Sequence, residues 1–421
     1  MALSENPNLA LIPSGYKSGK IYSVLPTTGV GDFDFSRSGT ATRINSQGLI
    51  ETVADGVPRL NYPLIDGKVV GCPSHLLENS ATNLITYSED LSNFSKTNIT
   101  EVNGNQVTPN GTIGSIKITP TSSAITELQI SSLTVGATYS FSFFVKKAEA
   151  SHLIINQAGS ASQKISYDIG NVSYIGISGV DANIVSYGNE WVRVEYSVNS
   201  LTYNNIRIIL SDGSDNYPYN PPIGDGLYLW GFQLEQGSYP TSYIPSLIGS
   251  QTTRSAETAN NSGDASTFND SEGVLMAEIS ALDDDVAISL SDNTFNNSIS
   301  FGVYLDKISA VVRKDGGYIT SGIIDTSTNP FNNNKIAIKY NSSSCDFYVN
   351  GFIIGSSNGV SYSSDVLDNL NFNRGSANDN FNGSTKQLQY FDSALNDSDL
   401  EKLTSWVSFS DMANGQLYTI E

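Results

Sequence analysis

Long stretches of the chain alternate between hydrophobic and polar positions with a period of two. Over 139–145 every second residue is Tyr, Phe or Val, and two of the three between them are Ser. Over 191–198 hydrophobic positions alternate with polar ones such as Arg193, which should point to water. Runs at 206–210 and 227–234 complete the set. Such short runs, separated by Gly, Asn and Pro turns, predict an antiparallel β-sandwich.

A second set of alternating runs begins near Gly273 and includes 299–305 and 336–340. Two further apolar runs, 347–349 and 352–354, flank the dipeptide Asn-Gly. Asn-Gly between apolar runs is the strongest short-range signal for a β-hairpin. The second set therefore predicts another antiparallel sandwich.

A closing strand and a single helix are expected near the C-terminal end. The run 387–391 has the pattern of a strand. After it, Ser398 and Glu401 have the spacing of a capping box, followed by a helical spacing of Leu400, Leu403 and Trp406. The fold class predicted is all-β with one short C-terminal helix.

These patterns divide the chain into four parts. Residues 1–78 are rich in turns and proline and have only short apolar runs, so they cannot easily bury a core alone. Residues 79–248 should form a jelly-roll and 271–421 a concanavalin-A-like sandwich, joined by a polar linker at 249–270. The N-terminal region should pack against another protein or another copy, so attachment is its expected role. Its deletion should leave both sandwiches soluble.

Composition excludes several classes of partner. The formal charge is −20, and only 15% of residues are charged. The sequence has no cluster of Lys and Arg, which nucleic-acid binding and anionic membrane surfaces both require. No apolar run reaches the roughly 20 residues of a membrane span. We therefore expect neither nucleic-acid binding nor membrane insertion.

The chemistry-bearing residues favour a protein that is not an enzyme. The two cysteines, Cys72 and Cys345, lie far apart and are expected to be unpaired thiols. The sequence has no Gly-rich phosphate loop, no Gly-x-Ser-x-Gly and no His-Glu-x-x-His. The paired-acid pattern Glu-x-Asp-x-x-Glu of some β-sandwich glycosidases is also absent, although distant carboxylates could still meet in the fold.

Two groups of side chains are candidate binding sites. Aromatic rings could form an exposed platform on which sugar rings stack, or they could fill a sandwich end, loops and subunit contacts. These are Tyr187, Trp191, Tyr203, Tyr217 and Tyr219. Trp230 should lie on the face of Phe232, in the core.

The second candidate is a loop, 211–226, that contains three aspartates and several glycines. Calcium takes 6–8 oxygen ligands, and such a loop could supply some of them, as a structural calcium site. The aspartates are Asp212, Asp215 and Asp225. An ordinary surface turn is the alternative, because Asp and Asn favour turn conformations. No other cofactor is expected.

Three segments resemble parts of tailed-bacteriophage virion proteins. Residues 35–43 read FSRSGTATR and are followed by GLIETVADGVPRL and, at 75–95, HLLENSATNLITYSEDLSNFS. The resemblance implies a virion-attachment motif that consists of Phe35, Arg37, Thr42, Arg43, Pro58 and Arg59. Residues 227–246, LYLWGFQLEQGSYPTSYIPS, with TRSAE at 253–257, are similar to the end of a carbohydrate-binding-module-type jelly-roll. Residues from 273 onward resemble laminin-G or concanavalin-A-like sandwiches.

What the resemblance implies is a structural protein of a phage particle. The motif arginines would pair with carboxylates or carbonyls of a partner, or locally within the module. The sandwiches would project as a homotrimeric head or tail fibre, the head slightly favoured, and bind host-surface or environmental glycans weakly and multivalently. The expected location is the virion, released by lysis, since residues 1–26 lack the layout of a secretion signal. The alternatives are a polysaccharide depolymerase and a bacterial surface adhesin or lectin.

Overall fold

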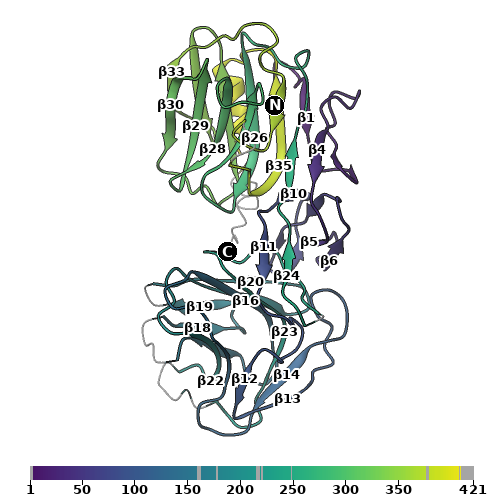
Figure 1. Ribbon diagram of the computed structural model, residues 1–421, viewed down its shortest axis with the longest axis vertical. Coiled ribbons are helices and arrows are strands. Elements are labelled where there is room, and N and C mark those ends of the chain that lie inside the picture. Colours follow the sequence, from purple (N-terminus) through teal and green to yellow (C-terminus); the bar gives the residue numbers. More distant parts are fainter. Residues whose placement is uncertain are drawn as a thin grey trace.

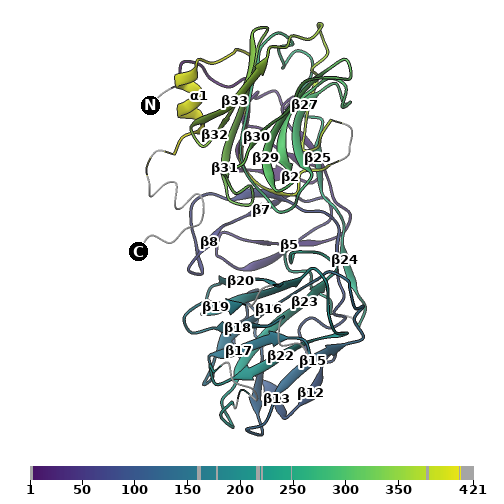
Figure 2. The same cartoon turned by 90° about the vertical axis from the view of Figure 1, so that its left-hand side faces the viewer.

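The computed structural model describes residues 3–158, 163–176, 179–214, 219, 221–247, 249–375, 379–406 and 408. Two β-sandwiches lie at opposite ends of an elongated molecule (Figure 1). The N-terminal segment runs along the C-terminal sandwich and forms a thin layer between the two (Figure 2). We call this middle region the waist. Apart from one helix, every described element is a strand, so the fold is all-β.

The central sandwich consists of two six-stranded antiparallel sheets, as the alternation predicted. In spatial order, one sheet contains β12 (Ser95–Thr97), β15 (Glu127–Ser131), β22 (Asn205–Ser211), β17 (His152–Asn156), β18 (Ile165–Asp168) and β19 (Ser173–Gly176). The other contains β13 (Ile99–Asn103), β14 (Ile116–Pro120), β23 (Leu227–Glu235), β16 (Tyr139–Lys147), β21 (Trp191–Val198) and β20 (Asp181–Ser186). Alternate residues such as Phe141, Phe143 and Val194 fill the space between the sheets.

The C-terminal sandwich also has two antiparallel sheets. The larger has the order β33 (Phe352–Asn358), β32 (Ser344–Val349), β31 (Asn334–Tyr340), β26 (Gly273–Ala281), β35 (Gly383–Phe391), β10 (Ser74–Leu77) and β7 (Arg59–Asn61), and β1 (Leu9–Leu11) also pairs with β35. The smaller has the order β30 (Gly317–Asp325), β29 (Lys307–Lys314), β28 (Ser298–Tyr304), β27 (Val286–Ser291) and β34 (Asn369–Asn371). The predicted hairpin joins β32 to β33, and Asn350 and Gly351 both have positive φ, as a tight two-residue turn requires.

The first 78 residues complete this C-terminal sandwich, which corrects the expectation that they pack against another protein. Along one edge of β35, β10 pairs with Gly383–Thr385 and β1 pairs with Leu388–Tyr390. Leu11 and Phe33 lie in the same buried cluster as Leu388 and Tyr390. Short strands without a core of their own gain hydrogen bonds and apolar burial at this edge, so the N-terminal region is part of the sandwich.

The expected linker, 249–270, is also built into the fold rather than free. It contains β24 (Thr252–Arg254) and β25 (Thr258–Asn260). Strand β24 pairs with β11 (Ala81–Asn83), and β25 extends a sheet of β2 (Tyr16–Lys17), β3 (Lys20–Ile21) and β4 (Phe33–Ser36). Two small hairpins complete the waist, β5 (Ala41–Ile44) with β6 (Ile50–Val53) and β8 (Leu64–Ile65) with β9 (Lys68–Val69). Several side chains of the segment, including Arg254 and Glu257, are buried as well, so it is part of the fold.

The single helix, α1 (Asp397–Thr404), is where the sequence predicts it, but its cap differs. Asn396 is the N-cap, and its side chain accepts a hydrogen bond from the backbone N–H of Asp399 at 3.0 Å. Ser398 lies within the first turn. No helix of the described residues combines the length and apolar character needed to cross a membrane. Cys72 is exposed, Cys345 is buried, and both are free thiols, as expected.

The outer face of the β16–β21–β23 sheet differs from the expected solvent-facing surface. Gly231, with a φ of +67°, forms a bulge in β23 opposite β16, so Trp230 points to the outer face and Phe232 to the core. This corrects the expectation that both lie on one face. Trp230, Trp191 and Phe144 form a buried cluster on the outer face, covered by Ile50 of β6 and by Tyr243. Hairpin β5–β6 is therefore docked on an aromatic face of the central sandwich.

We expect His75 to make the folded protein sensitive to mild acid. The ring is 1% exposed, and neither ring nitrogen has a hydrogen-bond partner among the described residues. Burial lowers the pKa of His75 to about 3, against 6.5 when unfolded. Below pH 6.5 only the unfolded state takes up this proton, so the free energy of unfolding should fall by about 1.4 kcal/mol per pH unit. Stability present at pH 7 is thus lost as pH falls.

Urea unfolding of the wild type and of His75→Leu between pH 7.5 and 5 measures this effect. The free energy of unfolding should change more steeply with pH in the wild type than in the variant, by the amount that corresponds to about one bound proton. Equal slopes for the two proteins would contradict the assignment. This window lies above the pH at which Glu78, whose pKa is about 2, loses its contribution.

Candidate functional site

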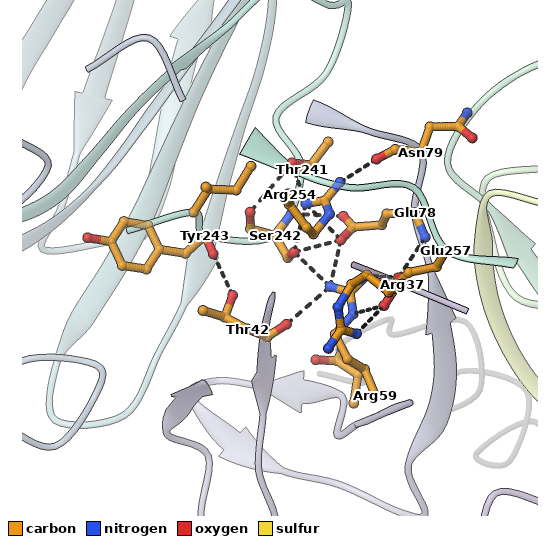
Figure 3. Close-up of polar contacts among 12 residues, drawn as sticks. Arg37, Thr42, Arg59, Glu78, Asn79, Thr241, Ser242, Tyr243, Arg254 and Glu257 are labelled. Carbon is orange, nitrogen blue, oxygen red and sulfur yellow. Dashed lines mark hydrogen bonds and ion pairs between the residues drawn. The ribbon is translucent and has the colours of Figure 1, made fainter. Parts of the chain in front are cut away.

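The waist contains a buried cluster of charged side chains. Arg37, Arg59, Arg254, Glu78 and Glu257 are each at most 3% exposed. They come from the N-terminal region and from the segment that follows the central sandwich, and they converge on one point between the two sandwiches (Figure 3). We call these five residues the ion-pair cluster.

Glu257 lies at the centre of one half of this cluster. Its Oε1 accepts hydrogen bonds from Nη1 of Arg37 at 2.7 Å and from Nε of Arg59 at 2.9 Å. Its Oε2 pairs with Nη2 of Arg59 and accepts from the backbone N–H of Glu78 at 3.1 Å. Bidentate pairing with a planar guanidinium fixes both position and orientation. Arg37 also donates to the carbonyls of Gly39, Ala54 and Val57, so backbone groups of the N-terminal region hold its guanidinium in place as well.

Glu78 occupies the other half. Its Oε2 lies 2.7 Å from Nη1 of Arg59 and 3.1 Å from Nη1 of Arg254, and it accepts from Oγ of Ser242 at 2.6 Å. Burial alone would raise the pKa of Glu78, but Arg254, Arg59 and the hydrogen bonds of Ser242 lower it to about 2. Burial would lower the pKa of Arg59, and Glu257 and Glu78 raise it instead. Glu78 and Arg59 are therefore both charged at neutral pH, and the charge of each is stabilised by its partners in the cluster.

The attachment motif inferred from the phage resemblance is largely inside the molecule. Phe35, Arg37, Thr42, Pro58 and Arg59 are all buried. Thr42 donates from Oγ1 to the carbonyl of Tyr243 at 2.5 Å, which joins β5 to the central sandwich. Arg37 and Arg59 pair with carboxylates of the same chain. The pair of Arg59 with Glu78 lies within the module, as the alternative of local pairing expects, whereas Glu257, which pairs with both arginines, lies outside it.

Arg43 is the partly accessible member of the motif. Its Nε lies 3.1 Å from Oε2 of Glu51, and its guanidinium lies over the ring of Tyr16. Sequence reasoning missed Glu78, Arg254 and Glu257 as partners. The available signal was that they fall within the two matching segments HLLEN and TRSAE in a chain that has few charges.

A groove opens beside the ion-pair cluster, between the two sandwiches. One part of it has a volume of about 590 Å³ and an adjoining part about 950 Å³. The two parts share four of their lining residues, so we treat them as one groove and call it the waist groove. The shared residues are Asn61, Asn183, Phe331 and Ser384. Volumes of 300–1,000 Å³ are typical of small-molecule sites.

Both sandwiches and the N-terminal region contribute walls to the waist groove. Tyr187, between β20 and β21, and Tyr239, after β23, line the part of about 590 Å³ from the side of the central sandwich. Tyr239 accepts a hydrogen bond at Oη from Nδ2 of Asn382, at 2.5 Å, and so connects the two sandwiches. Burial raises the pKa of Tyr187 and of Tyr239. Both phenols are therefore neutral hydrogen-bonding groups.

Arg193 shows why the expected water-facing side of β21 is covered. It is 7% exposed, and its Nη2 donates to Oγ of Ser142 at 2.9 Å and to the carbonyl of Thr241 at 2.7 Å. The segment after β23 folds over this face. Arg193 and Glu195 therefore line the floor of the waist groove rather than open solvent.

Of the five aromatic residues expected as a sugar platform, the four that the structure describes are not assembled into one. Trp191 is 0% exposed, and its indole N–H donates to the carbonyl of Val107 at 2.7 Å, so neither ring face is open to a sugar. Tyr219 is 6% exposed and packs on the other sheet with Ile154 and Ile209. Tyr203 is 39% exposed and follows the far end of β21 from Trp191. Tyr187 lines the waist groove, and Tyr217 lies outside the described residues.

The two described aspartates of the expected calcium loop, Asp212 and Asp225, each make local turn contacts. Asp212 accepts from the backbone N–H of Ser214 at 2.8 Å, an ordinary turn contact, and hydrogen bonds from the side chain and backbone of Ser214 lower its pKa. Asp225 donates its backbone N–H to the carbonyl of Pro222, and Asp215 lies outside the described residues. Among the described residues no group of three or more His, Cys, Asp or Glu could hold a metal ion. Calcium binding by this loop stays a prediction.

Comparisons with known proteins give structural likenesses only. No family model and no curated protein matches the chain. Among solved structures, a Ruminococcus gnavus IT-sialidase CBM40 is similar over 32% of this chain and 83% of that chain, with 16% identity and a TM-score of 0.28. Mouse laminin alpha1 chain domains LG4-5 are similar over 63% of this chain and 85% of that chain, with 11% identity and a TM-score of 0.24. Similarity at this level identifies neither a family nor a ligand for this chain.

Proposed function

We propose that this protein is a non-enzymatic structural component of a phage particle that presents two β-sandwiches for weak, multivalent binding to glycans. The observation that carries the proposal is the ion-pair cluster. The residues that resemble a phage virion module, Arg37 and Arg59, join the N-terminal region to the segment that follows the central sandwich. A joint of this kind suits a protein that holds binding domains at a fixed distance from a surface.

The proposal differs from the sequence-based one in how the module works. Because five of the six motif residues are buried, the motif stabilises the appendage rather than touching the particle. Contact with other virion proteins would use exposed surface elsewhere. A homotrimer would multiply weak glycan contacts, since linked sites raise the effective concentration of each other.

Immunogold labelling of purified virions tests the location. An antibody against the C-terminal sandwich should label intact particles, at the head for a head fibre or at the tail for a tail fibre. Label on bacterial surfaces but not on particles would overturn the proposal in favour of an adhesin. The mass of the protein in solution, compared with 45.2 kDa for one chain, tests the trimer.

A further inference from the structure

We propose that the waist groove is the glycan site of this protein and that it takes a neutral, extended oligosaccharide. The inference rests on the glycan-binding part of the proposed function and adds its location and the chemical class of its ligand. It depends on three features of the groove, which are its aromatic walls, its hydroxyl- and amide-rich lining, and the sign of its unpaired charges.

Aromatic side chains face the groove from opposite sandwiches. Phe331, in the loop between β30 and β31, is 44% exposed although it is large and apolar. Tyr187 and Tyr239 lie on the central side. The C–H faces of a sugar ring pack on aromatic rings, which provide large apolar area with few rotatable bonds. A ligand lying between these rings would contact both sandwiches at once.

Between the aromatic rings, the lining of the groove provides both hydrogen-bond donors and hydrogen-bond acceptors. Asn61, Asn183 and Ser384 belong to both parts of the groove, and Asn332 lines its larger part. Amides supply donors and acceptors, and hydroxyls supply either, which matches the alternating hydroxyl groups of a hexose. Sites of this composition orient a ligand by its polar groups while the apolar walls supply contact area.

The charges in the groove favour a neutral ligand over an anionic one. The cationic groups are occupied, because Arg43 pairs with Glu51, Arg193 with Glu195, and Lys386 with Glu278.

Two exposed carboxylates, Asp66 and Asp181, line the groove and have no ion-pair partner among the described residues. A carboxylate accepts hydrogen bonds from two neighbouring hydroxyls, but it repels a uronate or a sialic acid. The net charge of −20 acts in the same direction.

The ion-pair cluster makes the groove preorganised. Glu78 and Ser242 both line one part of the groove. Glu78 belongs to the ion-pair cluster, and Ser242 donates a hydrogen bond to Glu78. The walls are therefore held in place before a ligand arrives, which lowers the cost of ordering them on binding. The groove exists only where the two sandwiches and the N-terminal region meet, so an isolated sandwich would lack it.

Calorimetric titration of the full chain with cellohexaose, maltohexaose, chitohexaose and a hyaluronan hexasaccharide tests the inference. At least one of the three neutral hexamers should bind, and the anionic hyaluronan fragment should not. Phe331→Ala should weaken that binding by about tenfold or more, since an exposed ring at the centre of a site carries much of its affinity. Asp181→Asn should weaken it by a smaller factor.

Tyr203→Ala is the matched control, because this ring is similarly exposed but lies outside the groove. It should leave binding unchanged, and all three variants should unfold at the same urea concentration as the wild type. Binding of hyaluronan alone, binding that Phe331→Ala does not alter, or no binding by any neutral hexamer would each overturn the inference. If the antibody labelled virions but no neutral hexamer bound, the structural role in the particle would stand and the glycan site would fail. The failure of the glycan site is therefore distinguishable from the failure of the proposed function.

Discussion

Deleting residues 1–78 is expected to unfold the C-terminal sandwich while the central sandwich stays folded. The deletion removes β1, β7 and β10 from the larger sheet and takes Leu9, Leu11 and Phe33 out of its core. Removing a single buried Leu side chain costs about 2–5 kcal/mol, and a domain is stable by only about 5–15 kcal/mol. The core of the central sandwich lies within residues 85–234, so its own packing is retained.

Hydrogen exchange of the truncated protein measures this directly. Amides of β26 and β35 should exchange rapidly, whereas those of β16 and β21 should stay protected. In the full chain, Leu11→Ala should give a smaller loss of the same kind, and Ile12→Ala, at a 45% exposed position, should give almost none. A truncated protein with β35 fully protected would contradict the assignment of the N-terminal region to this sandwich.

Glu257→Gln is expected to destabilise the protein by about 3–5 kcal/mol. The change keeps the size of the side chain but leaves Arg37 and Arg59 without the carboxylate that pairs with both. Removing one partner from a buried ion pair is costly because it leaves an uncompensated buried charge. The measurement is the free energy of unfolding in urea at pH 7.

Glu51→Gln is the matched control. Glu51 pairs with Arg43 at 3.1 Å, but its side chain is 43% exposed, and water screens such pairs. Exposed ion pairs contribute about 0–1 kcal/mol. If Glu257→Gln cost no more than Glu51→Gln, the ion-pair cluster would not be holding the waist together.

Local pattern was sufficient for much of the fold. Alternation over 191–198 corresponds to β21, and Asn350-Gly351 forms the turn it predicts. These features depend only on residues close together in the sequence. Successive side chains of a strand point to opposite faces of the sheet, so alternation in the sequence identifies the buried face. The same holds for the helix near the C-terminal end, although its cap is Asn396 and it ends at Thr404, before Trp406.

Long-range pairing and the covering of faces could not be obtained in this way. Nothing local to Leu9 indicates that it will pair opposite Tyr390. Alternation correctly predicted that Arg193 points away from the core. It does not indicate what covers that outer face, which is the segment after β23. The same limit applies to Trp191, whose outer face is occupied by the hairpin β5–β6. The waist groove was missed because three separate parts of the chain form it.

We expect the N-terminal region and the ion-pair cluster to join both sandwiches into one rigid unit. Pulsed electron paramagnetic resonance between spin labels at Tyr203 and Ile353, with Cys72 replaced, tests it most directly. Both positions are exposed, one on each sandwich. A single narrow distance distribution is the result we predict. A broad or multimodal distribution in the full-length protein would contradict the claim, because it would show two sandwiches that move independently.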